Sequence, residues 1–168
     1  KKLINKNYFG KIYHISGEYN FGRVEKITKG WRGKIPFYSV THGGGIHIID
    51  LANYLTSKKA TRVIACGNKI ATEKSKFRFN DMASALVEFE DKSILNLTSN
   101  FGCMVPHHHN FKVFGTKATF CQEMDSAKIF KSRSNLKKGI KVNTNYLNKD
   151  KKYILENFID SIVKKQKP

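Results

Sequence analysis

Acidic side chains are scarce in this chain of 168 residues, which has 13 Asp and Glu against 31 Lys and Arg. The resulting formal net charge of +18 attracts anions at low salt. The lysines, however, are scattered along the whole chain, as is typical of a solvated surface. Arginine, which suits bidentate phosphate contacts better, occurs only at Arg23, Arg32, Arg62, Arg78 and Arg133. A basic nucleic-acid-binding domain is therefore the less favoured interpretation of this charge.

Long apolar runs and paired cysteines are also missing. No run approaches the roughly 18 apolar residues that a membrane-spanning helix needs, and the N-terminus does not read as a signal peptide. Cys66, Cys103 and Cys121 are odd in number and match no metal-binding spacing, which favours reduced thiols in a cytoplasmic protein. The length and the 40% hydrophobic content predict a single globular domain over 1–168. The first residue is not Met, so we expect a fragment of a longer protein.

The sequence that is present alternates in the manner of β-strands. In 11–27, Tyr13, Ile15 and Tyr19 alternate with polar residues, at the period of two that a half-buried strand requires. Only a short turn separates 82–90 from 93–101, which favours an antiparallel hairpin. Further strands are predicted over 60–70, over 109–122 with a break at Gly115 and Thr116, and more weakly over 126–131.

Two helices complete the pattern. A helix is predicted over 46–56, where Ile48, Leu51, Ala52 and Leu55 fall on one face. A second begins after Asp150, with an apolar stripe formed by Leu155, Phe158, Ile159 and Ile162. Strands in a consecutive run predict an α+β fold, namely an open, mostly antiparallel sheet with helices on one face. We expect its uncovered face to expose an apolar patch that drives oligomerisation.

A dinucleotide-binding fingerprint is missing as well. Gly43, Gly44 and Gly45 lack the GxGxxG spacing and do not clearly follow a strand. The chain therefore contains no Rossmann domain, and any nicotinamide cofactor would be bound elsewhere.

The densest group of candidate functional residues surrounds the glycine run. His47, Asp50 and Tyr54 share the helix face opposite the apolar stripe, and His42 precedes the glycines. A neutral histidine there can accept a proton, and glycines allow a ligand to approach free backbone N–H groups. The alternative is that His47 and Asp50 only tie the helix to the sheet.

A second group is the run His107, His108 and His109. In an extended segment, His107 and His109 share one face and His108 the other. No cysteine or carboxylate lies nearby in the sequence, so hydrogen bonding to a ligand, or a structural role, is favoured over a metal site.

Five segments, taken in order, carry a resemblance to a known family. They are Gly10–Ile12, Gly30–Arg32, Gly43–Leu51, Asn80–Asp81 and Phe114–Phe120. Together they resemble the C-terminal domain of the glucose–fructose oxidoreductase, inositol dehydrogenase and rhizopine catabolism (Gfo/Idh/MocA) family. The stretch Asn100–His109 resembles a branch that acts on nucleotide-activated or other complex sugars.

The resemblance implies a two-domain NAD(P)-dependent sugar oxidoreductase. Its N-terminal Rossmann domain binds the cofactor and supplies a lysine in a Glu-Lys-Pro motif, which is absent here. Its C-terminal domain, of the glyceraldehyde-3-phosphate dehydrogenase type, lines the sugar site and makes a dimer or tetramer through its sheet. This chain alone would be inactive. A non-enzymatic dimerisation or carbohydrate-binding module of the same fold remains the alternative.

The resemblance also implies residue roles. His47 matches the histidine of the family's Asp-x-Gly-x-His motif, but Gly43 stands where the aspartate is expected, so His42 is the candidate to share the catalytic role. Asp50 is expected to orient His47 and take part in the substrate site. The other expected substrate-binding residues are Trp31, Arg32, His107, His108 and His109.

Overall fold

The computed structural model describes residues 1–124, 126–143 and 152–166. The helices are α1 (Lys2–Asn5), α2 (Glu25–Thr28), α3 (Ile46–Thr56) and α4 (Lys152–Val163), with a 3₁₀ turn at Trp31–Lys34 and a π-helical turn at Thr41–Gly45. The strands are β1 (Ile12–Asn20), β2 (Ala60–Asn68), β3 (Met82–Phe89), β4 (Ile94–Asn100), β5 (His108–Gly115), β6 (Thr119–Glu123), β7 (Ser126–Phe130) and β8 (Ile140–Lys141).

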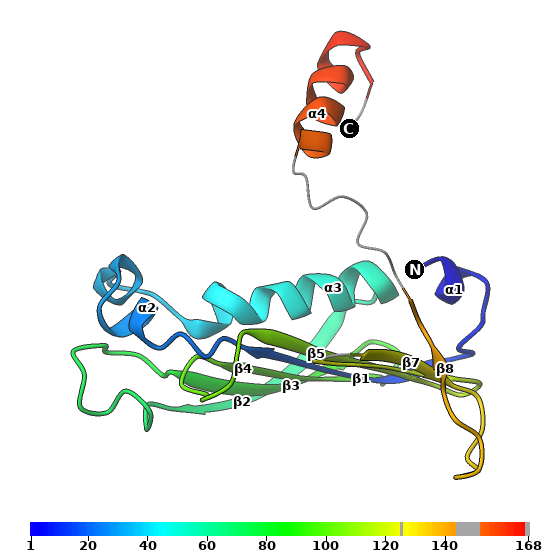
Figure 1. Ribbon diagram of the computed structural model, residues 1–168, viewed down its shortest axis with the longest axis horizontal. Coiled ribbons are helices and arrows are strands. Elements are labelled where there is room, and N and C mark those ends of the chain that lie inside the picture. Colours follow the sequence, from blue (N-terminus) through cyan, green and yellow to red (C-terminus); the bar gives the residue numbers. More distant parts are fainter. Residues whose placement is uncertain (125, 144–151, 167–168) are drawn as a thin grey trace.

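The described strands form one open sheet in the order β2-β3-β4-β1-β5-β6-β7-β8. The pair β1 and β4 is parallel, whereas the other neighbouring pairs are antiparallel, including the predicted hairpin of β3 and β4. Helices α1, α2 and α3 lie on one face of the sheet (Figure 1). The predicted α+β class, with a mostly antiparallel open sheet, is confirmed.

Helix α3 lies across the centre of the sheet because small and branched residues meet there. On β1, Ile15 and Tyr19 point toward α3 and are buried, as are Ile48 and Ala52 of the helix. Gly17 lies between these two β1 residues, and a Cβ there would overlap the side chain of Ile48. The missing side chain thus lets the helix approach the strand closely, and this contact fixes the beginning of α3 over the central strand.

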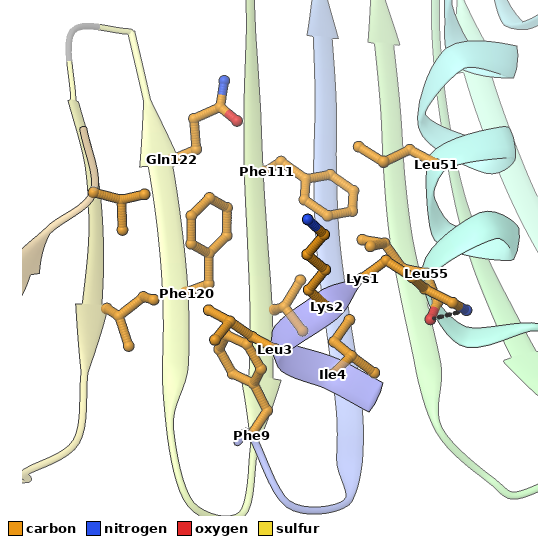
Figure 2. A pocket seen from close by; sticks show the side chains of 13 residues that line it. Lys1, Lys2, Leu3, Ile4, Phe9, Leu51, Leu55, Phe111, Phe120 and Gln122 are labelled. Carbon is orange, nitrogen blue, oxygen red and sulfur yellow. Dashed lines mark hydrogen bonds between the residues drawn. The ribbon is translucent and has the colours of Figure 1, made fainter. Parts of the chain in front are cut away.

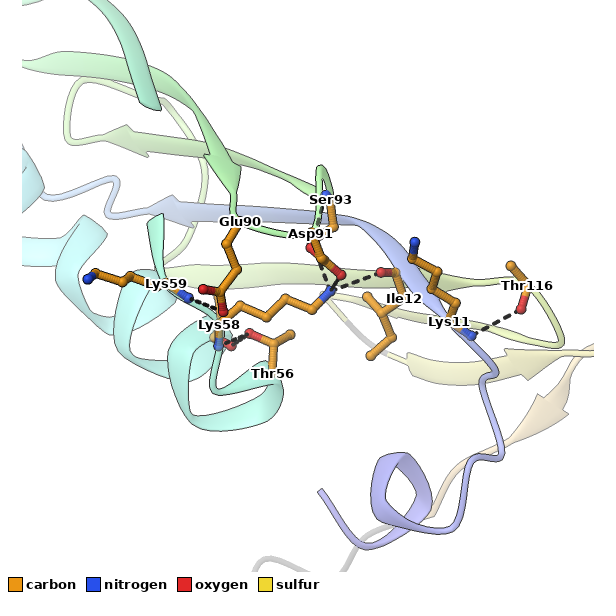
Figure 3. Close-up of polar contacts among 10 residues, drawn as sticks. Lys11, Ile12, Thr56, Lys58, Lys59, Glu90, Asp91, Ser93 and Thr116 are labelled. Carbon is orange, nitrogen blue, oxygen red and sulfur yellow. Dashed lines mark hydrogen bonds and ion pairs between the residues drawn. The ribbon is translucent and has the colours of Figure 1, made fainter. Parts of the chain in front are cut away.

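The C-terminal end of α3 is held by one lysine. The helix ends at Ser57, whose φ of 56° lies in the left-handed region. Lys58 Nζ then lies 2.7 Å from Asp91 Oδ2, 2.9 Å from Ser93 Oγ and 3.0 Å from the Ile12 carbonyl oxygen (Figure 3). A single ammonium group therefore joins the helix end, the central strand and the β3–β4 turn.

The uncovered face of the sheet is polar at its centre. Glu18 on β1 accepts hydrogen bonds from Asn20 and Asn110, and Ser84 hydrogen-bonds to Thr98 across β3 and β4. Exposed apolar side chains on this face gather toward one side, at Ile64, Leu86 and Ile94 of β2, β3 and β4. The expected large apolar patch is thus wrong for the centre of the face because, beyond His14 and Ile94, the outward positions of β1 and β4 hold serine, threonine, asparagine and glutamate.

Several boundaries differ from the sequence prediction. The first strand ends at Asn20 rather than 27, because Ile27 turns into the core on α2 and is fully buried. The predicted helix over 46–56 has the observed bounds, but helical backbone already starts at Thr41. The final helix is present as α4, whereas the cap assigned to Asp150 falls outside the described residues. The apolar stripe of α4 is exposed, with Phe158 at 55% and Ile159 at 49%.

Candidate functional site

Six rings gather at the edge of the sheet where β1 and β4 end and β5 begins. We call this the ring cluster: Tyr19, Phe21, His47, Phe101, His107 and His109. Tyr19 lies at its centre, with ring centroids 4.6 Å from His109, 5.2 Å from His107 and 5.6 Å from His47. The parallel pairing of β1 with β4 brings their carboxyl ends to the same edge, so segments distant in sequence form one site.

His107 and His109 share a face, as their alternation predicted, and their ring centroids are 5.0 Å apart. Burial lowers the pKa of both imidazoles, and nearby groups lower it further: Arg23 and His47 act on His107, and His107 and His47 act on His109. The Nε2 atom of His109 is buried and has no hydrogen-bond partner among the described residues. The lowered pKa values keep both rings neutral near pH 7, and a neutral imidazole can donate or accept a hydrogen bond.

His108 lies apart from this pair. Its Nδ1 is 2.8 Å from the Pro106 carbonyl oxygen, and its Nε2 is 3.3 Å from Asn20 Nδ2. Asn20 also donates to Glu18 of the open face. The structure therefore does not bring His108 together with the other expected substrate-binding histidines.

His47 projects from the first turn of α3 and is exposed, while its ring stacks on Tyr19 at an interplanar angle of 27°. Asp50 is also exposed, and no hydrogen bond joins it to His47 in the described part of the chain. No direct contact therefore supports the expected role of Asp50 in orienting His47. The ring of His47 instead packs against Tyr19.

The glycine run serves packing rather than an open approach to backbone N–H groups. Gly43 to Gly45 belong to the π-helical turn that continues into α3, and Gly44 and Gly45 are buried. A Cβ at Gly44 would overlap the Tyr19 ring, and one at Gly43 would overlap the Tyr38 hydroxyl. The expectation that these glycines expose free N–H groups is wrong because they lie in a hydrogen-bonded helical turn, in which the Gly43 N–H donates to the Ser39 carbonyl oxygen at 2.8 Å.

Tyr38 fills the position in which a side chain at 43 would lie. Its side chain is 8% exposed, and its Oη is buried, with Arg32 close by but outside good hydrogen-bond geometry among the described residues. Burial raises the pKa of this phenol, while the positive charge of Arg32 and its weak hydrogen bond to the hydroxyl oppose the rise. Sequence reasoning missed Tyr38, since an aromatic residue in a segment without periodicity gives no signal of where it packs.

Two arginines flank the ring cluster. Arg32, on the 3₁₀ turn, lies 4.7 Å over the exposed ring of Trp31, and Arg23 lies 5.5 Å over the ring of Phe21. Both guanidinium groups lower the pKa of Tyr19 electrostatically, against the larger effect of its burial. Arg32 and Trp31 were expected here, whereas Arg23 was missed.

His42 lies on the π-helical turn and is exposed. It forms no hydrogen bond and no ring contact within the described ranges. The structure thus places it near His47 along the chain but gives it no partner in the ring cluster.

A large cavity lies away from these residues. It has a volume of about 460 Å³ and is lined largely by apolar side chains, among them Leu51 and Leu55 of α3 and Phe111 and Phe120 of the sheet (Figure 2). No group of three or more His, Cys, Asp or Glu side chains in the described part of the chain could hold a metal ion. No described helix is long and apolar enough to cross a membrane.

Three solved structures with the same fold carry the names of dehydrogenases. The chain superposes on UDP-N-acetylglucosamine 3-dehydrogenase from Acidithiobacillus ferrooxidans with a TM-score of 0.72 at 18% identity, covering 99% of this chain and 49% of that one. The TM-score with scyllo-inositol dehydrogenase from Lactobacillus casei, solved with NAD(H) and scyllo-inositol, is 0.70 at 20% identity, covering 98% of this chain and 50% of that one. The TM-score with a levoglucosan dehydrogenase in complex with NADH is 0.74 at 17% identity, covering 99% of this chain and 53% of that one.

The chain thus spans about half the length of each of these structures. None of the curated protein sequences matches it. The sequence profile of the GFO/IDH/MocA C-terminal domain, however, matches residues 1–121. With that profile and the open sheet in agreement, the chain belongs to the GFO/IDH/MocA oxidoreductase family, of which it forms a C-terminal domain.

Proposed function

We propose that the chain is the substrate-binding and oligomerisation domain of an NAD(P)-dependent dehydrogenase that acts on a sugar or a nucleotide-sugar. Its family membership supports this function, as do three structural neighbours whose names are those of sugar or inositol dehydrogenases. The chain contains no glycine-rich fingerprint for a dinucleotide, so the cofactor would be bound by another domain of the protein, where it accepts the hydride. Alone, the chain would be inactive.

In this proposal, the chain itself binds the sugar and accepts the proton of the sugar hydroxyl. When a sugar carbinol is oxidised, the carbon loses a hydride and the hydroxyl loses a proton to a base. His47 is the candidate base because it is exposed beside the neutral pair His107 and His109. His42 remains the candidate to share this role, and Asp50 and Trp31 the candidates to contact the sugar from the rim.

The observation that carries the proposal is the stacking of the exposed His47 ring on Tyr19, in one cluster with His107 and His109. The test is His47→Ala in the protein expressed from its full reading frame. We expect kcat for sugar oxidation to fall by about 10²–10⁴, which is the usual effect of removing a general acid or base. Cofactor reduction is followed by absorbance, and KM is measured alongside.

His14→Gln is the matched control, because His14 stacks on Phe114 outside the ring cluster. His42→Ala shows whether the second histidine shares the role. Turnover of His47→Ala at the rate of the unmodified protein would refute the assignment. A reading frame that encodes no dinucleotide-binding domain would support the alternative of a non-enzymatic carbohydrate-binding or dimerisation module.

The open face of the sheet is the proposed oligomer contact. Ile64, Leu86 and Ile94 offer an apolar edge, and the polar rows beside them can pair with a second copy. We expect a dimer or tetramer by native mass spectrometry, and Leu86→Glu should shift the population toward monomer. A monomer at micromolar concentration without any substitution would contradict this assembly.

The cytoplasm is the proposed compartment. Cys66, Cys103 and Cys121 are all free thiols, which fits a reducing environment.

A further inference from the structure

We propose that Arg23 and Arg32 bind an anionic group of the substrate, a phosphate or a carboxylate, beside the ring cluster. This inference rests on the proposed function and narrows its substrate to a sugar that carries a negative charge. Three features of the two guanidinium groups support this site: they lie beside the ring cluster, no carboxylate among the described residues pairs with them, and aromatic rings hold them in place.

Their position is the first step. Arg23 follows β1 and Arg32 follows α2, yet both act electrostatically on Tyr19, the central ring of the cluster. Arg23 lies 5.5 Å over the ring of Phe21, a member of the cluster, and Arg32 contacts the hydroxyl of Tyr38, whose ring centroid is 6.4 Å from that of Phe101. Two positive charges from separate segments therefore converge on the rings that are proposed to hold the sugar.

The missing counter-charge is the second step. Five lysines form ion pairs with carboxylates in the described part of the chain: Lys58, Lys92, Lys112, Lys152 and Lys164. Within the same part of the chain, neither Arg23 nor Arg32 lies within 4.0 Å of a carboxylate. Glu18, on the neighbouring strand β1, is engaged by Asn20 and Asn110. The anion that would complete this site is therefore not supplied by the described residues.

The histidines do not supply the positive charge in place of the arginines. The lowered pKa values of His107 and His109 keep both rings neutral near pH 7. Neutral imidazoles suit hydroxyl groups, whereas guanidinium groups suit phosphate or carboxylate oxygens. The site thus separates into a neutral part for the sugar ring and a charged part for an anionic substituent.

Pre-organisation is the third step. Each guanidinium group lies over an aromatic ring, Arg23 over Phe21 and Arg32 over Trp31, at 5.5 Å and 4.7 Å from the centroid. Such contacts restrict a long side chain before a ligand arrives, so less conformational entropy is lost on binding. Lys1 and Lys131 also lie over rings, those of Tyr54 and Tyr8, but both rings are outside the ring cluster. The arginine pair therefore differs from the general positive charge of the chain in combining such stacking with a position beside the cluster.

The test uses the full-length protein and four substrate classes: a neutral sugar, a sugar 1-phosphate, a nucleoside-diphosphate sugar and a uronic acid. We expect kcat/KM for at least one anionic class to exceed that for the neutral sugar by about 10-fold or more, and to fall as salt is added. The three anionic substrates distinguish a phosphate, a diphosphate and a carboxylate as the recognised group.

Arg23→Gln and Arg32→Gln should each raise KM for the preferred anionic substrate by about 10–100-fold, a clearly larger factor than the change in KM for the neutral sugar. Arg133→Gln is the matched control, since Arg133 lies beside Thr116 and Lys117 and not beside the rings. Thermal unfolding of each variant shows that it is folded.

A binding measurement separates this inference from the proposed function. Titration with inorganic pyrophosphate in a calorimeter should show binding that is weakened by either arginine substitution and not by Arg133→Gln. Equal kcat/KM for neutral and anionic sugars, or pyrophosphate binding that is the same in all variants, would overturn the anion site. Unchanged turnover in His47→Ala would instead overturn the proposed chemistry and leave the binding result standing.

Discussion

The two ends of α3 differ in whether the buried polar atoms beside them have hydrogen-bond partners. At the beginning of the helix, the His109 and Tyr38 side chains have polar atoms that are buried and without a hydrogen bond of good geometry among the described residues. At the other end, polar groups are paired through Lys58, and the neighbouring cavity of about 460 Å³ is largely apolar. The comparison teaches that the candidate chemistry lies where polar atoms lack partners, and not beside the large apolar cavity.

Among substitutions at the two ends of α3, the largest loss of stability is expected at Gly44. A methyl group there would overlap the ring of Tyr19, so Gly44→Ala should destabilise the fold by about 2–3 kcal/mol and displace the His47 ring. Chemical denaturation measures the change in the free energy of unfolding. Gly45→Ala is the matched control, because its nearest atom, Thr41 Cγ2, is 3.3 Å away and alanine favours helix. Equal stability of the two variants would show that the rings can move aside.

A smaller effect is expected at the other end of the helix. Lys58→Met keeps the aliphatic stem but removes three polar contacts, so we expect a loss of about 1–2 kcal/mol in denaturant titration at pH 7. The Asp91 side chain is 29% exposed, and solvent screening holds the loss at this modest level. Lys92→Met is the control, because its ion pair with Glu88 is exposed to solvent, so its removal should change the free energy of unfolding little.

The ion pair of Lys58 with Asp91 also predicts that the free energy of unfolding depends on pH. Burial would raise the pKa of Asp91, but hydrogen bonds from Lys58 and Ser93 outweigh it and hold this pKa well below 3.8. Since the folded pKa is depressed, the pair contributes fully above the unfolded value of 3.8 and loses its contribution as the pH falls below it. The stability difference between the unsubstituted protein and Lys58→Met should therefore shrink on acidification below pH 3.8. A constant difference would mean that Lys58 acts through packing alone.

Much of this architecture follows from patterns in the sequence. The period of two placed the strands and put His107 and His109 on one face, and the apolar spacing placed α3 at 46–56. The parallel pairing of β1 with β4 was not predictable in this way, because alternation reports which face a residue takes and not which strand lies beside it.

The candidate site was predictable only in part, for a similar reason. Tyr38 and Arg23 come to the ring cluster through tertiary packing: Tyr38 occupies space left by Gly43, and Arg23 is placed over Phe21 where β1 ends. Tyr38 lies outside the predicted strands and helices, and Arg23 lies near the end of the strand predicted over 11–27, where no local pattern marks it as a site residue. The glycine run did mark the site, but its physical role was misjudged, since the contacts of Gly44 with Tyr19 depend on how α3 crosses the sheet.

The central place of β1 has a consequence for how the chain reaches its fold. Ile15, near the N-terminus, lies opposite Leu95 on one side and Val113 on the other. During synthesis, β1 therefore cannot pair until β4 and β5 have been translated. Such long-range pairing slows folding and leaves an apolar strand open to wrong partners. Yield on expression should thus respond to early-strand substitutions and to chaperone supply more than to changes at the late strands β7 and β8.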